Sequence, residues 1–193
     1  MDTPAFVSFL QQRNAAARLS EPAPAADELD AMLQAAMRVP DHGRLQPWRF
    51  LLIDGQGREA LGELFVEAQR RRTGMDDEKA ASLRQKPLRA PLIVVVIACL
   101  QQHPKAPIIE QQLSAGCAAH NLLLAAEALG YAGIWRTGSM AFDAHVAEGL
   151  GLAANEQIIG FVYIGSRAGE RKPLPVLTTD DFVRHWPAGR EGW

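Results

Sequence analysis

The sequence predicts a protein that combines helices and strands around one core, and two segments carry most of that prediction. Residues 91–99 (PLIVVVIAC) are apolar on both faces and rich in β-branched side chains, which is typical of a central strand. Residues 108–129 form a long, largely apolar stretch followed by Gly130, a common helix terminator. A chain of 193 residues, 48% of them hydrophobic, can bury a substantial core, so we expect a single domain over residues 1–193.

The elements before residue 91 follow from capping residues, prolines and apolar spacing. Thr3 and Pro4 predict a helix start, and Pro22 and Pro24 indicate an extended loop after that helix. Pro40 ends the second helix, whose apolar residues recur at helical spacing. The expected elements are helices over 3–12, 25–38 and 58–72 and a buried strand over 48–54, with room for one more short helix before residue 89.

After residue 99 the pattern alternates between helix and strand. The expected elements are the helix over 108–129, a short strand over 133–137, a helix over 143–150 and a strong strand over 157–165. The tail from residue 166 to 193 has no clear periodicity. It could wrap a partner subunit or be disordered, and the sequence does not separate these alternatives.

The helix over 108–129 has an unusual surface. It is apolar nearly all round beyond Gln112, and residues 114–119 are all small. At 1.5 Å per residue it is about 33 Å long, and such a helix must be covered on most sides. It is either a central core helix or, as we favour for a chain of this size, a helix at a subunit interface.

Composition excludes several classes of function. The net charge of −2 and the lack of a basic cluster make nucleic acid a poor partner. The longest apolar run is too short to span a bilayer, and the first residues do not resemble a signal peptide. Cys99 and Cys117 form no redox or disulfide motif, and the five histidines have no metal-ligand spacing. We therefore expect a cytoplasmic protein without a metal.

One motif is misleading. Residues 55–60 match G-x-G-x-x-A after a strand and before a helix, as in dinucleotide-binding proteins. That fold needs a second parallel strand soon after the helix, whereas residues 70–89 are charged and lack an apolar run. We interpret the glycines as a tight turn, with a dinucleotide-binding protein that lacks flavin as the minor alternative.

Three separated segments carry groups that suit a phosphate and a planar ring. They are residues 13–18 (RNAAAR), 38–48 (RVPDHGRLQPW) and 133–138 (GIWRTG). Further motifs lie around Arg89 (RAPLI), at Glu110-Gln111 and over residues 114–118 (SAGCA). With this set of segments and motifs in this order, the chain resembles the nitroreductase family of FMN-dependent enzymes. The resemblance covers residues 6–165.

The resemblance implies an α+β fold with a central mixed, mainly antiparallel sheet flanked by helices. It also implies an intertwined homodimer with two FMN sites, each built from both subunits. By position, Arg13, Asn14 and Ala15 and then Trp135, Arg136 and Thr137 contact FMN from one subunit, and Arg38 and His42 reach it from the other. Asn14 and Ala15 depart from the family, which often has a basic residue and a serine there.

The implied activity is hydride transfer from NAD(P)H to a small acceptor, such as a nitroaromatic or quinone, by a ping-pong mechanism. The flavin carries this chemistry, so no catalytic side chain is needed. Arg13 and Arg136 can supply charge-assisted hydrogen bonds to the phosphate. The alternative is a protein that binds or consumes FMN without turning over NAD(P)H. The acceptor and the choice between NADH and NADPH stay open.

Overall fold

The structure is a computed structural model that describes residues 3–186. Its sheet is antiparallel in every pairing that it shows. β3 lies between β2 and β5, and β4 pairs with β5 along the edge opposite β3. The strands are β1 (Leu19–Ser20), β2 (Trp48–Ile53), β3 (Leu92–Cys99), β4 (Ala132–Arg136) and β5 (Glu156–Arg167).

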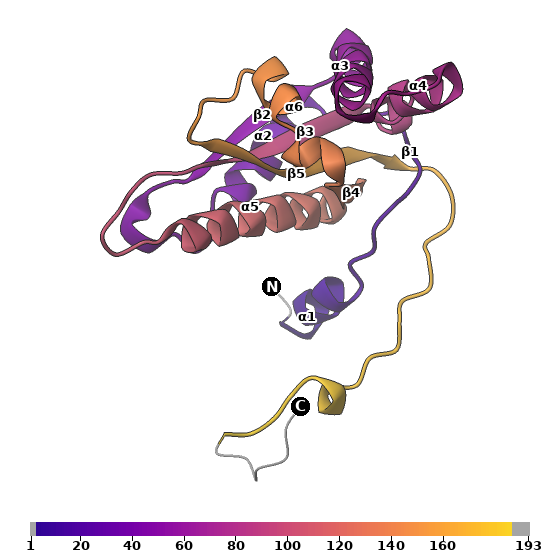
Figure 1. Ribbon diagram of the computed structural model, residues 1–193. Helices are drawn as coiled ribbons and strands as arrows, with labels where there is room; N and C mark the ends of the chain where they lie inside the picture. Colours follow the sequence, from indigo (N-terminus) through magenta and orange to yellow (C-terminus); the bar gives the residue numbers. More distant parts are fainter. Residues whose placement is uncertain (1–2, 187–193) are drawn as a thin grey trace.

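Helices cover both faces of this sheet (Figure 1). α2 and α5 cover one face, and α3, α4 and α6 cover the other. The α-helices are α1 (Thr3–Gln11), α2 (Ala26–Ala36), α3 (Gly55–Thr73), α4 (Asp77–Arg84), α5 (Ile108–Ala128) and α6 (Ala144–Gly149). Short 3-10 turns are η1 (His42–Arg44), η2 (Pro87–Arg89), η3 (Ser139–Phe142) and η4 (Thr179–Asp181).

β3 explains why the sequence pattern of its strand is continuously apolar. Ile93, Val95 and Ile97 pack under α3 and α6, while Val94 and Val96 pack under α5. Both faces are therefore buried, and the strand needs apolar side chains at every position.

The predicted long strand and long helix are confirmed within one residue at each end, at 92–99 and 108–128. β1 was missed because a two-residue strand has no periodicity. No parallel pairing occurs among the described residues, so the mixed character expected of the sheet is not seen within one chain.

The structure also decides what the glycine motif does. α3 begins at Gly55 itself, with a φ of 44°, so the predicted turn is the first turn of the helix. The next strand, β3, runs antiparallel to β2. A dinucleotide-binding βαβ unit requires these two strands to be parallel, so the dinucleotide-binding alternative is wrong.

The surface of α5 is consistent both with a central core helix and with a helix at a subunit interface. Ala115, Ala119 and Leu122 pack on the sheet, while Ile109 and Leu113 remain exposed at 58% and 61%. None of the described helices has the length and apolar character needed to cross a membrane.

Two arms extend from the body of the molecule (Figure 1). α1 and the segment after β5 both stand away from the sheet. α1 exposes Phe6 and Val7, and the tail exposes Val176 and Trp186, the last two at 95%. Both arms therefore present large apolar side chains to solvent within one chain.

Candidate functional site

The end of β4 lies at the centre of the candidate site. Ile134 and Arg136 face the α3 side of the sheet, and Trp135 faces α5, as strand alternation requires. The Trp135 indole Nε1 donates a hydrogen bond to the Ile159 carbonyl at 3.2 Å. Gly160 is needed here, because a Cβ at that position would overlap the indole.

A bulge in the neighbouring strand makes room for this contact. The register between β3 and β5 shifts between Val96 and Ile97, which pair with Gly160 and Ile158 respectively. Ile159 is therefore left out of the ladder, and its carbonyl accepts from Trp135 instead.

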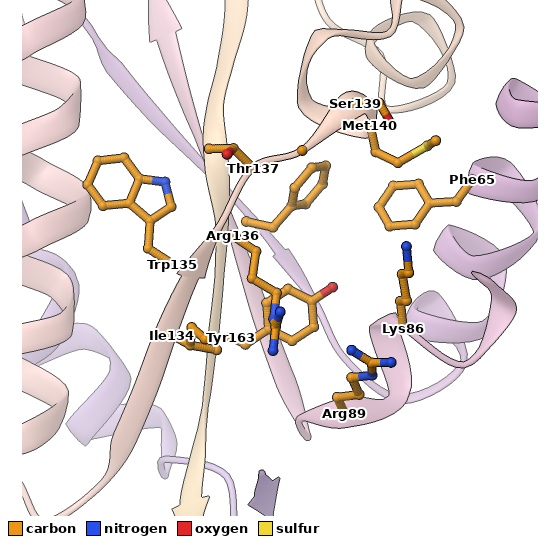
Figure 2. A pocket seen from close by; sticks show the side chains of 12 residues that line it. Phe65, Lys86, Arg89, Ile134, Trp135, Arg136, Thr137, Ser139, Met140 and Tyr163 are labelled. Carbon is orange, nitrogen blue, oxygen red and sulfur yellow. The ribbon is translucent and has the colours of Figure 1, made fainter. Parts of the chain in front are cut away.

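A cavity of about 380 Å³ lies on the Arg136 side of β4 (Figure 2). Three cationic side chains line it: Lys86, which directly precedes η2, Arg89 at the end of η2 and Arg136 at the end of β4. Its other walls include Phe65 and Tyr163. None of the residues that line it carries a carboxylate. The cavity therefore combines aromatic walls with uncompensated positive charge.

Arg136 is held in this cavity by an aromatic ring. Its guanidinium carbon lies 5.6 Å from the centroid of the Tyr163 ring, a cation–π distance. Its Nε is buried and has no hydrogen-bond partner among the described residues. Burial raises the pKa of the Tyr163 hydroxyl, and the charges of Arg136 and Arg89 partly oppose that rise. This buried donor is therefore free to bond an acceptor from outside the described residues, such as a water molecule or a ligand group.

A second cavity, of about 460 Å³, lies beside the loop that follows α1. Arg13, Ala15, Trp135 and Thr137 line it together with His120. The Ala16 amide donates to the Gly133 carbonyl at 3.0 Å, which fixes the loop along β4. Thus two of the three predicted segments, 120 residues apart in the chain, meet at one cavity.

The third predicted segment, residues 38–48, lies outside these two cavities and begins with a loop held by internal hydrogen bonds. The Asp41 carboxylate accepts hydrogen bonds from the amides of Leu45 and Gln46, at 3.1 and 2.8 Å. Gly43 has a φ of 81°, and Arg44 and Gln46 adopt positive φ values of 55° and 49°, which are unusual for side-chain-bearing residues. Such strain persists only where surrounding contacts impose it.

The N-terminal half of α5 imposes those contacts. Ser114 Oγ donates to the Pro40 carbonyl at 2.7 Å, and Glu110 Oε2 lies 2.6 Å from Nδ1 of His42. The loop with Arg38 and Arg44 encloses a separate cavity of about 370 Å³. None of the cavities described above, all lined by residues between 3 and 186, brings Arg38 or His42 together with Arg13 or Trp135.

Two further observations differ from the site residues that the family resemblance implies. Asn14 is buried, and its side-chain amide donates to the Lys172 carbonyl at 2.7 Å rather than pointing into a cavity. Lys86 and Arg89 were not among the predicted site residues. In the sequence, Arg89 stands at the start of the RAPLI motif and Lys86 lies in a charged stretch without periodicity, so only the packing of the chain brings them to the site.

The fold and these cavities place the protein in a known class. The model of the nitroreductase family matches residues 17–166, and the chain belongs to that family. The predicted family and its nitroreductase-like α+β fold are thereby confirmed. The chain is 41% identical over 160 residues to the "Putative NAD(P)H nitroreductase YdjA" of Escherichia coli K12, covering 83% of this chain and 87% of that protein.

Solved structures share the fold at lower identity. A nitroreductase-like family protein from Bacillus cereus has a TM-score of 0.80 at 20% identity, over 93% of this chain and 94% of its own. A nitroreductase with bound FMN from Bacteroides fragilis NCTC 9343 has a TM-score of 0.71 at 22% identity, over 93% of this chain and 97% of its own.

Proposed function

We propose that this protein binds FMN and transfers hydride from NAD(P)H to a small acceptor such as a nitroaromatic or a quinone. The observation that carries the proposal is the meeting of Arg13 and Ala15 with Trp135 and Thr137 at one cavity beside β4. The neighbouring cavity shares Trp135 and Thr137 with that meeting point and is lined by Lys86, Arg89 and Arg136, and the Arg136 Nε has no acceptor among the described residues. The fold is shared with a protein whose structure contains FMN.

The residues present fit the two ends of FMN. A phosphate needs guanidinium groups and amide donors, which Arg13 and the backbone at Ala15 can supply. The flavin ring needs a flat apolar wall and polar groups along one edge. The cavity in Figure 2 offers Phe65 and Tyr163 as walls and Lys86, Arg89 and Arg136 as polar groups, so we propose that Arg136 lies beside the ring and not at the phosphate, where the resemblance suggests it. We therefore propose a single FMN-binding domain in which Trp135, Arg136 and Thr137 hold the cofactor.

We propose an intertwined homodimer as the active form. β2 pairs on one side only among the described residues, and α1, the tail and the outer face of α5 expose large apolar side chains. A second copy would cover these surfaces. It would also bring its own Arg38 and His42 to the cofactor, which explains why these residues lie apart from Arg13 within one chain.

FMN bound at this site would supply the hydride chemistry, and no side chain of the protein would need to act as an acid or base. The protein's task is to bind and orient. Arg136 and Lys86 would place positive charge beside the cofactor of their own chain. The loop over residues 38–46, held by hydrogen bonds to Asp41, would present Arg38 and His42 to the cofactor of the second copy. We propose that NAD(P)H and the acceptor bind in turn at the same position, which gives ping-pong kinetics.

We propose that the protein lies in the cytoplasm, where its two free cysteines would stay reduced.

One experiment tests both the cofactor and the assembly. The purified protein, loaded with FMN, should be yellow, and native mass spectrometry should show two chains and two FMN molecules. Anaerobic NADH or NADPH should bleach the flavin absorbance, and a nitroaromatic or quinone should restore it. A protein that binds FMN but leaves it oxidised would be a flavin-binding or flavin-consuming protein instead. A colourless monomer would refute the proposal.

A further inference from the structure

His42 and Glu110 form a close pair between two segments that lie 68 residues apart in the sequence. His42 belongs to η1, and Glu110 lies in the first turn of α5. Oε2 of Glu110 is 2.6 Å from Nδ1 of His42, and the side chains of His42 and Glu110 are 53% and 43% exposed. An ionised carboxylate can only accept a hydrogen bond, so this contact requires a proton on Nδ1 of the imidazole.

The pair leaves one ring nitrogen of His42 available to a ligand. No hydrogen bond or ion pair engages Nε2 of His42 within residues 3–186. The ring is therefore held at Nδ1 and open at Nε2. A hydrogen bond at one ring nitrogen decides which nitrogen of a histidine carries the proton and which way the ring faces.

The backbone on both sides of His42 is also fixed to the region where α5 begins. Ser114 Oγ, one turn further along α5, donates to the Pro40 carbonyl at 2.7 Å. On the other side, a Cβ added at Gly43 would lie 3.3 Å from Cε1 of His103, so the loop before α5 packs closely against η1. The position of the imidazole is thus set by backbone contacts, and its orientation is set by Glu110.

Gln111 holds the loop before α5 in place. Its side chain is 2% exposed, and its Nε2 donates to the carbonyls of Gln101 and Ala106 at 2.8 and 2.9 Å. Its Oε1 accepts from the Gln101 amide at 2.9 Å. Glu110 therefore extends from a helical turn that is tied to the segments around it, and its carboxylate has a defined place from which to hold His42.

We infer that Glu110 is a positioning residue that holds the His42 imidazole through Nδ1, so that Nε2 is presented to the cofactor of a second copy. The inference rests on the proposed function, including the homodimer, because neither cavity beside β4 is lined by His42 of the same chain. A side chain that is already oriented loses less conformational freedom when it binds. Glu110 therefore contributes to FMN affinity through His42, without touching FMN.

The first test is a double-mutant cycle on FMN affinity. Dissociation constants are measured from flavin fluorescence at neutral pH for the full-length protein, and native mass spectrometry confirms the dimer for each variant. Glu110→Ala and His42→Ala should each weaken FMN binding about five- to tenfold, the scale of one hydrogen bond. The double variant should be no more than about twofold worse than His42→Ala, because Glu110 acts only through His42.

The second measurement reports the tautomer of His42, which a merely structural role of Glu110 would not change. Proton–nitrogen NMR spectra of protein with isotope-labelled histidine distinguish a protonated Nδ1 from a protonated Nε2, and His42→Ala identifies the signal. At alkaline pH, where imidazoles are neutral, the unaltered protein should carry the His42 proton on Nδ1. Glu110→Ala should show a mixture of the two tautomers.

Two further variants complete the design. Glu67→Gln is the matched control, because Oε2 of Glu67 lies 3.3 Å from Nε2 of His145 in a second carboxylate–histidine pair, whose members line neither cavity beside β4. It should leave the FMN dissociation constant unchanged. Glu110→Met keeps the length of the side chain without a carboxylate acceptor, so it should match Glu110→Ala and carries the test if that variant does not fold.

Several outcomes would overturn the inference. They are a loss of FMN affinity from Glu110→Ala that persists in the His42→Ala background, an unchanged FMN constant in either single variant, and an unchanged tautomer. A Glu110 variant that is monomeric would also overturn it, because Glu110 would then act on assembly. Failure of the unaltered protein to bind FMN or to dimerise would instead overturn the proposed function.

Discussion

The ion pair between Glu156 and Arg49 gives a quantitative prediction about stability. Arg49 on β2 donates from Nε to Glu156 Oε1 at 2.8 Å and from Nη2 to Oε2 at 2.6 Å, across the end of β3. The carboxylate also accepts from the Ala153 amide at 2.8 Å. The hydrogen bond from Arg49 is the main reason that the pKa of Glu156 falls from 4.5 to about 2, and the Ala153 amide adds to it.

The magnitude follows from that difference in pKa. A fall from 4.5 to about 2 corresponds to about 3.4 kcal/mol at about 1.36 kcal/mol for each tenfold change in the proton equilibrium. The Glu156 side chain is only 12% exposed, but Arg49 is 40% exposed, so we reduce the expected contribution to about 1–2 kcal/mol. Because the folded-state pKa is the lower one, the contribution is fully present above about pH 4.5 and disappears as the pH falls toward 2.

The assay is urea unfolding of the FMN-free protein at fixed concentration. At pH 7, Glu156→Gln should lower the free energy of unfolding by about 1–2 kcal/mol, and the difference from the unaltered protein should shrink as the pH falls from 4.5 to 3. Glu63→Gln is the control, because the pair of Glu63 with Arg84 is more exposed and should be worth less than about 1 kcal/mol. A difference that is independent of pH would refute the reasoning.

Three other predictions concern the site and the assembly. Gly160→Ala forces a Cβ into the Trp135 indole and should cost about 1–3 kcal/mol of stability, with a shift in tryptophan fluorescence; an unchanged spectrum and melting temperature would contradict the close approach. Arg136→Gln removes a cation from the cavity lined by Lys86 and Arg89. Because Arg136 would act near the ring, the binding of both FMN and riboflavin should weaken about tenfold. A loss of affinity for FMN alone would place Arg136 at the phosphate instead. Deleting residues 174–193 removes exposed apolar side chains of the tail and should shift the native mass toward the monomer, while the Glu67→Gln control stays a dimer.

The sequence by itself determined most of the secondary structure. β3 and α5 are recognisable because a strand buried on both faces must be continuously apolar, and because an apolar helix 21 residues long has a clear end at Gly130. The sequence also marked residues 13–15 and 135–137 as parts of a site, through their resemblance to a family. Short pieces such as β1 escaped because two residues carry no periodicity.

Only the tertiary structure decided which of these residues share a cavity. The route of the loop after α1 along β4 brings Arg13 and Ala15 to Trp135, and the return of the chain after β5 gives Asn14 a partner at Lys172. Lys86 and Arg89 join Arg136 because η2 lies opposite β4 across the cavity. Periodicity reports which face of an element is buried. The meeting of distant segments depends on the packing of the whole sheet and its helices, which no local pattern in the sequence encodes.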